Sequence, residues 1–116
     1  MRDHTKLKAF TLADALTLRV YETTRWFPVE ERFCLAAQMR RSALSVPCNI
    51  VEGCGRHTEA DFLYHLDMAH GSALELEYQA SLAQRLHYLR PEQASLVDGC
   101  IEVSKVVNGL IRSLRR

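Results

Sequence analysis

The chain has 116 residues, of which 47% are hydrophobic, 25% are charged and 8% are aromatic, and its formal net charge is +1. This length indicates a single folded domain over residues 1–116, and the composition excludes an intrinsically disordered chain, a collagen and a mucin-like stalk. Because the net charge is so small, no overall electric field would draw the protein to nucleic acid or to an anionic membrane.

The first predicted helix follows a short polar segment. Residues 1–10 carry charges but no apolar run of the kind found in secretory signals, and we expect a loosely ordered N-terminal segment there. A helix is predicted from Leu12 to Trp26, because Thr11 and Asp14 have the spacing of a capping box.

A second helix is predicted from Val29 to Glu52, after Pro28 has reset the chain direction. Pro47 lies inside this segment and should kink the helix, since proline removes one backbone donor. The run Gly53-Cys54-Gly55 should end it, because glycine readily adopts the left-handed conformation found after helix C-termini.

Two further helices complete the prediction. Thr58 and Asp61 are spaced to cap a third helix that runs to about Leu89, and Pro91 occupies a first-turn position of a fourth helix that continues to near Arg116. All connections are short, and short links between long helices favour antiparallel neighbours. The predicted fold is therefore an all-α, antiparallel, up-down four-helix bundle.

Apolar residues recur alternately three and four positions apart, which is typical of helices packed side by side. The predicted seam of the third helix is Phe62, Leu66, Ala69, Ala73, Leu76, Ala80 and Ala83, and that of the fourth is Leu96, Cys100, Val103, Val107, Leu110 and Leu114. The second and third helices carry additional apolar stripes, which include Phe33, Leu44, Val51, Leu74 and Tyr78. A lone small bundle buries one face of each helix, so this surplus favours self-association, although singly exposed apolar residues are also normal.

The sequence also bears on cellular location. No segment approaches the roughly 18 consecutive apolar residues of a membrane span. Cys34, Cys48, Cys54 and Cys100 form neither a C-x-x-C pair nor a zinc-finger pattern. We expect reduced, mostly buried thiols and a cytoplasmic protein.

One polar stripe stands out on the second helix. Gln38, Arg41, Ser45, Asn49 and Glu52 share a face, whereas Arg40 falls among apolar positions. A buried arginine is seldom unpaired, and we expect Glu75 of the third helix, one turn after Ser72, to pair with it. Replacing Glu75 with alanine should then lower the free energy of unfolding by about 3–5 kcal/mol.

Two interpretations of these residues differ in function. The favoured one is a structural polar network that fixes helix register or subunit docking, formed by Arg40, Arg41, Asn49, Glu52, Ser72 and Glu75. The alternative is a small-ligand or hydrolytic site in which Glu52 and Glu75 act as acid and base beside Arg40 or Arg41. No nucleophile with an adjacent base and no phosphate-cradling glycine loop accompanies them, so we expect no enzymatic activity and no cofactor.

Other candidate sites are weaker. His57 and Asp61, or Asp61 and His65, lie one turn apart and could share a metal ion, but no established metal-binding motif surrounds them, and we expect no metal site. Trp26-Phe27 could stack nucleic-acid bases, although a plug at the bundle end is the favoured interpretation. Arg112, Arg115 and Arg116 are candidate nucleic-acid contacts, with a solvated helix end as the simpler explanation.

The run from Phe27-Pro28 through Arg40-Arg41 to Ser45-Val46-Pro47-x-Asn49-Ile50-x-Glu52-Gly53 resembles the four-helix bundle family of 23S ribosomal RNA intervening-sequence proteins. Phe62, Leu66, Ala69, Gly71-Ser72 and Glu75-Leu76 continue the match, which extends from about Phe10 to the end of the chain. The resemblance implies a homopentameric ring without a defined cellular role. It also implies a likeness to the accessory variability protein of diversity-generating retroelements, a basic pentamer that binds nucleic acid and a reverse transcriptase.

These observations leave two functions open besides the enzymatic one. The first is a non-enzymatic oligomeric adaptor for RNA, DNA or a ribonucleoprotein. The second is a purely structural or protein-binding ring that contacts no nucleic acid. The net charge of +1 departs from the basic retroelement relative and weakens the case for strong nucleic-acid binding.

Overall fold

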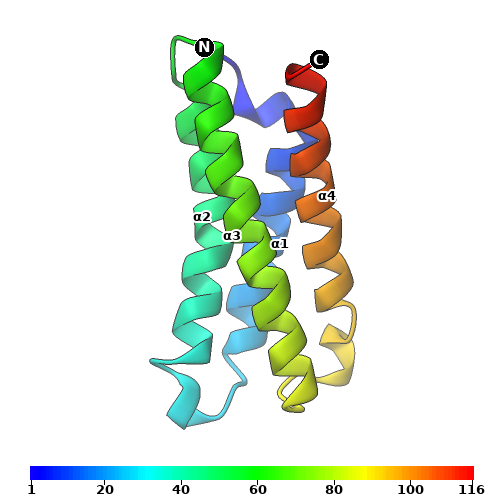
Figure 1. Ribbon diagram of the computed structural model, residues 1–116. Helices are drawn as coiled ribbons and strands as arrows, with labels where there is room; N and C mark the ends of the chain where they lie inside the picture. The colour runs from blue at the N-terminus through cyan, green and yellow to red at the C-terminus, as the bar shows by residue number, and fades with distance from the viewer.

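The computed structural model describes residues 1–116 as four long helices and three short 3-10 helices, without β-strands. The long helices are α1 (Lys8–Thr24), α2 (Leu35–Cys54), α3 (Glu59–Arg85) and α4 (Leu96–Leu114), and the 3-10 helices are η1 (His4–Lys6), η2 (Val29–Glu31) and η3 (Pro91–Gln93). Figure 1 shows the four helices running up and down along one axis, with both chain ends at the same end of the bundle. The predicted all-α four-helix architecture is confirmed.

Each helix packs against two neighbours, in the cyclic order α1, α2, α3, α4. The bundle is elongated, with principal extents of 43 × 22 × 20 Å. All seven seam residues predicted for α3 are buried, which confirms the periodicity argument for this helix. On α4 the seam shifts in its last turns, where Ile111 is buried while Leu110 and Leu114 are only half-buried.

The N-terminal segment corrects the predicted start of the first helix. Residues 4–6 form η1, and α1 begins at Lys8 rather than at Leu12, so the Thr11–Asp14 pair lies inside the helix. The backbone N–H of Arg2 donates to Cys54 O at 2.8 Å, and the Arg2 guanidinium lies 4.4 Å from the centre of the Phe62 ring. These contacts attach the segment that was expected to be loose to α2 and α3.

The helix boundaries around the loops show one confirmed cap and two corrections. Thr58 caps α3 as predicted, since its hydroxyl oxygen accepts from Asp61 N at 3.1 Å. Gly55 caps α2 with φ −81°, in the right-handed region, so the predicted left-handed glycine is absent. Pro91 begins η3, which precedes α4, instead of the first turn of α4 itself.

The second predicted helix is also shorter at its start, because residues 29–31 form η2 and α2 begins only at Leu35. From there α2 continues through Pro47 to Cys54. The buried side chains of Met39, Val46 and Ile50 fill the interior, whereas Phe33, Leu44 and Val51 remain exposed. The structure therefore separates the two apolar stripes of this segment into a core face and an outer face.

Candidate functional site

A hydrogen-bonded polar network joins α2 to α3. The hydroxyl oxygens of Ser45 and Ser72 lie 2.8 Å apart. The Asn49 side-chain amide donates to Ser45 O at 2.9 Å, and its Oδ1 lies 3.3 Å from Nδ1 of His65, which is buried. These residues recur one or two turns apart on their helices, so they form a ladder that fixes the register of α2 against α3. Asn49 and Ser72, two of the predicted network residues, meet in it through Ser45.

Arg40 has partners that differ from the predicted one. Its Nε donates to Thr24 Oγ1 at 2.7 Å, its terminal nitrogen lies 3.4 Å from Tyr21 O, and its guanidinium lies 4.9 Å from the Tyr21 ring centre. Arg40 forms no salt bridge, and Glu75 is exposed and also forms none. The predicted Arg40–Glu75 ion pair within the chain is therefore wrong, because residue 40 faces α1 rather than α3.

The remaining members of the predicted network lie on the surface and do not converge. Glu52 pairs at 2.7 Å with Arg56, which follows the end of α2, and Arg41 is exposed without a salt bridge. The Ser45–Ser72 contact places Glu75 level with the part of α2 that precedes Ser45, whereas Glu52 lies about two turns beyond it. The single chain thus does not assemble the acid–base pair with an arginine that a hydrolytic site would need.

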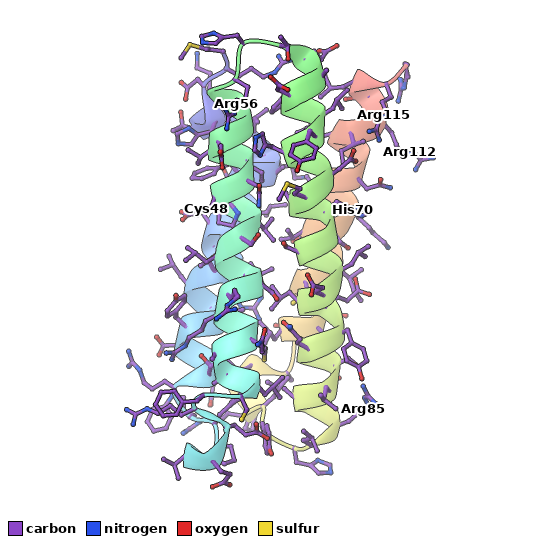
Figure 2. All side chains as sticks on the ribbon, turned by 60° about the vertical axis from the view of Figure 1, so that its left-hand side comes forward. Cys48, Arg56, His70, Arg85, Arg112 and Arg115 are labelled. Atoms are coloured by element: carbon purple, nitrogen blue, oxygen red, sulfur yellow. The ribbon has the colours of Figure 1, made fainter.

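The C-terminal arginines lie at the end of the bundle that holds both chain termini. Figure 2 shows Arg112 and Arg115 there, at the end of α4, with Arg56, just after α2, at the same end and Arg85 at the opposite end. Arg115 forms a two-pronged contact with the Asp67 carboxylate, at 2.7 and 3.3 Å, so its charge is partly neutralised. Arg112 and Arg116 are exposed and form no salt bridge.

The cysteines and histidines offer little chemistry. Cys54 and Cys100 are buried, whereas Cys34 and Cys48 are exposed, so the thiols are less uniformly buried than expected. Burial raises the pKa of the Cys100 thiol to about 12, which keeps it protonated and unreactive. No group of three or more His, Cys, Asp or Glu side chains is placed to hold a metal ion. None of the helices combines the length and apolar composition that crossing a bilayer requires.

Two exposed apolar surfaces are left uncovered by the chain itself. The α1/α2 groove, a hollow of about 350 Å³, is lined by Phe10, Asp14, Leu44, Pro47, Cys48, Val51 and Glu52. The α3 stripe consists of Tyr64, Met68, Leu74 and Tyr78, which are 61%, 44%, 47% and 63% exposed. Figure 2 shows Cys48, in the groove, on the side of α2 that is turned away from α3. The two surfaces therefore lie on different sides of the bundle.

Trp26 and Phe27 differ in burial, so each fits a different one of the two predicted roles. Phe27 is buried and packs at 5.3 Å from the Tyr88 ring, so it plugs the bundle end as expected. Trp26 is 56% exposed, and the guanidinium of Arg90 lies 4.6 Å from its ring centre. The sequence analysis did not identify the cleft that Arg25, Arg32 and Arg40 line at this corner. The sequence signal for it is the high frequency of arginine around the connection between the first two long helices.

The chain is similar to known proteins both in sequence and in structure. The sequence pattern of the family described as 23S rRNA-intervening sequence protein matches residues 5–109. A crystal structure of a Bacteroides thetaiotaomicron protein of unknown function from the S23 ribosomal protein family is similar, with a TM-score of 0.80 and 26% identity. That similarity covers 90% of this chain and 95% of the other. No match was found among curated proteins.

Proposed function

Because this chain belongs to the family of 23S rRNA-intervening sequence proteins, we propose that it is a non-enzymatic subunit of a homo-oligomeric ring that serves as an adaptor for nucleic acid or a ribonucleoprotein. The observation that carries the oligomer is the pair of uncovered apolar surfaces, the α1/α2 groove and the α3 stripe. Exposed apolar surface of this kind is found at interaction sites more often than on the rest of a protein's surface.

The placement of the two surfaces favours a ring over a two-fold dimer. A two-fold contact joins the same patch on both subunits, whereas two different patches meet head to tail and close into a ring when the rotation permits. Here the groove belongs to α1 and α2, and the stripe belongs to α3. The number of five subunits comes from the family resemblance and not from this geometry.

One unpaired arginine lies beside the groove and one unpaired glutamate lies in the stripe, while the groove itself is lined by the carboxylates of Asp14 and Glu52. Arg41 is exposed one turn before Leu44, at the edge of the groove, and Glu75 is exposed between Leu74 and Tyr78 in the stripe. Neither forms a salt bridge within the chain. We therefore propose that Arg41 of one subunit pairs with Glu75 of the next, which gives both residues a role at the subunit contact.

The mass of the assembly in solution tests this proposal. Light scattering should give about five chain masses for the wild type, and Leu44→Glu and Tyr78→Glu should each reduce it to one. Leu86→Glu, at an exposed apolar residue outside both surfaces, is the matched control and should leave the mass unchanged. Arg41→Glu should weaken the ring and the double variant Arg41→Glu/Glu75→Arg should restore it. A monomeric wild type would overturn the ring.

The adaptor role has a separate test. Purified wild-type protein should retain structured RNA or DNA at low salt and release it as salt rises, because phosphate contacts displace bound counterions. An absence of retention at low salt would overturn the nucleic-acid role and leave the alternative of a purely structural or protein-binding ring. A hydrolytic role has weaker support, because Arg40, Arg41, Glu52 and Glu75 do not converge in the chain.

A further inference from the structure

A cleft lined by three arginines lies where α1 passes into α2, at the end of the bundle opposite to the chain termini (Figure 1). Its volume is about 350 Å³. The lining residues are Thr24, Arg25, Phe27, Pro28, Val29, Arg32, Ala36 and Arg40. No acidic residue is among them, so this arginine cleft concentrates positive charge in a protein whose net charge is only +1.

Arg40 is fixed in the wall of the cleft by neutral partners. Its Nε donates to the hydroxyl of Thr24, a residue that is 4% exposed, and the guanidinium also contacts the carbonyl and the ring of Tyr21. These contacts orient the side chain but leave its charge uncompensated. A half-buried, pre-oriented guanidinium without a counter-ion favours binding of an anion, because the cost of ordering the side chain has already been met.

The nearby acidic residues do not neutralise the cleft. Glu31 precedes Arg32 in sequence, but its carboxylate accepts from Tyr88 OH at 2.9 Å and from Leu35 N at 3.3 Å. Glu30 is exposed and does not line the cleft. The four salt bridges of the chain involve Arg2, Arg56, Arg90 and Arg115, so none of the three cleft arginines is engaged in one.

We infer that the arginine cleft binds a phosphate group of a single-stranded nucleic acid. Several guanidinium groups around one cavity suit the multiple oxygens of a phosphate, onto which arginine donates in pairs. Two exposed aromatic residues adjoin the cleft arginines in sequence, Trp26 beside Arg25 and Phe33 beside Arg32, and they are 56% and 87% exposed. Proteins bind unpaired strands through basic residues that hold the phosphates and exposed rings on which bases stack; here the two rings flank the cleft without lining it.

This inference rests on the nucleic-acid part of the proposed function and is independent of ring formation. It moves the expected contact from Arg112, Arg115 and Arg116 to the opposite end of the bundle. Because Trp26 is the only tryptophan of the chain, its fluorescence reports directly on the neighbourhood of the cleft.

The experiment titrates the full-length protein with a short single-stranded oligouridylate at several salt concentrations and follows Trp26 fluorescence and fluorescence polarisation of the labelled strand. Arg25→Gln/Arg32→Gln removes two cleft charges and leaves Arg40 in place. Arg85→Gln/Lys105→Gln is the matched control, since it removes two exposed charges that do not line the cleft. Arg112→Gln/Arg116→Gln tests the rival surface. Inorganic phosphate is titrated separately and as a competitor, which distinguishes free phosphate from a nucleic-acid strand as the preferred ligand.

We expect the cleft variant to bind at least tenfold more weakly, with a salt dependence reduced by about one unit of slope for each lost phosphate contact. The control should bind like the wild type, and phosphate should compete only at much higher concentration than the strand. An equal loss in the control, a loss confined to the C-terminal variant, or stronger binding of free phosphate would overturn the cleft assignment while the adaptor proposal stands. An absence of oligouridylate binding by the wild type at low salt would also overturn the cleft assignment, and retention of structured RNA or DNA then decides the adaptor proposal separately.

Discussion

The hydroxyl oxygen of Thr17 on α1 lies 3.1 Å from the carbonyl oxygen of Ala43 on α2. Ala43 is the residue four positions before Pro47, and proline has no N–H to donate to that carbonyl. Thr17 also lies 2.8 Å from Ala13 O, so its single proton is shared between the two acceptors. A side chain of one helix thus supplies the hydrogen bond that proline removes from the next, and α2 continues through Pro47.

Thr17→Val should lower the free energy of unfolding by about 1–3 kcal/mol, because it leaves the buried Ala43 carbonyl without a donor. In a Pro47→Ala background the same change should lower the free energy of unfolding by less, since the backbone N–H of residue 47 would then donate to Ala43 O. Urea denaturation of the four proteins of this cycle measures the coupling. An equal cost in both backgrounds would contradict the compensation, and Thr11→Val, at an exposed threonine, is the control.

Gly53→Ala should destabilise the bundle by about 1–3 kcal/mol through overpacking. An added Cβ would lie 2.9 Å from His65 Cβ and 3.1 Å from Phe62 Cδ1, where α2 and α3 approach closely. Gly109→Ala is the matched control in α4, because an added Cβ there meets nothing within 4 Å. That change should instead stabilise by about 0.5–1 kcal/mol through helix propensity. Thermal unfolding checks both, and two shifts of the same sign would refute the close-approach explanation.

His87→Gly should stabilise the protein by about 1 kcal/mol. His87 has φ 63°, a left-handed conformation that is costly for residues other than glycine. It ends α3 in a Schellman motif, in which Tyr88 N donates to Ala83 O at 2.9 Å and His87 N donates to Gln84 O at 3.0 Å. Calorimetry of His87→Gly and His87→Ala tests this, and a gain in the alanine variant as well would place the cause outside the backbone conformation.

Thiol labelling at about pH 8 should separate the four cysteines by burial and by assembly. Cys100 has a pKa raised to about 12, so its thiolate fraction at this pH is negligible, and burial also raises the pKa of Cys54; both should react only on unfolding. Exposed Cys34 should react in every state. Cys48 lines the α1/α2 groove and should be protected in the wild-type ring but reactive in Leu44→Glu. Labelling of Cys48 at the Cys34 rate in the wild type would contradict the proposed contact.

Glu75→Ala should change the unfolding free energy of a monomeric Leu44→Glu background by less than about 0.5 kcal/mol, because Glu75 is exposed and forms no salt bridge. In the wild-type background it should instead weaken the assembly, which shows as a stronger dependence of the melting temperature on protein concentration. A loss near 3 kcal/mol in the monomeric background would restore the buried ion pair that the sequence suggested.

The predicted candidate site was only partly assembled by the fold. Asn49 and Ser72 do meet across α2 and α3, through Ser45, because all three lie on the helix faces that the three-to-four spacing brings together. The Arg40–Glu75 pair failed for a geometric reason. Complementary charge identifies which residues can pair, but the direction in which each helix turns its side chains decides which of them come within reach.

The sequence by itself determined the fold class, the number of long helices and the buried face of α3. These features depend on local periodicity and on caps such as Thr58, which residues near one another in the chain establish. Only the tertiary structure decided that Arg40 faces α1 and that Thr17 compensates for Pro47. It also decided that Arg25, Arg32 and Arg40 line one cleft. Such contacts join residues distant in sequence, and they arise only when packing of the apolar faces has fixed the rotation of each helix about its own axis.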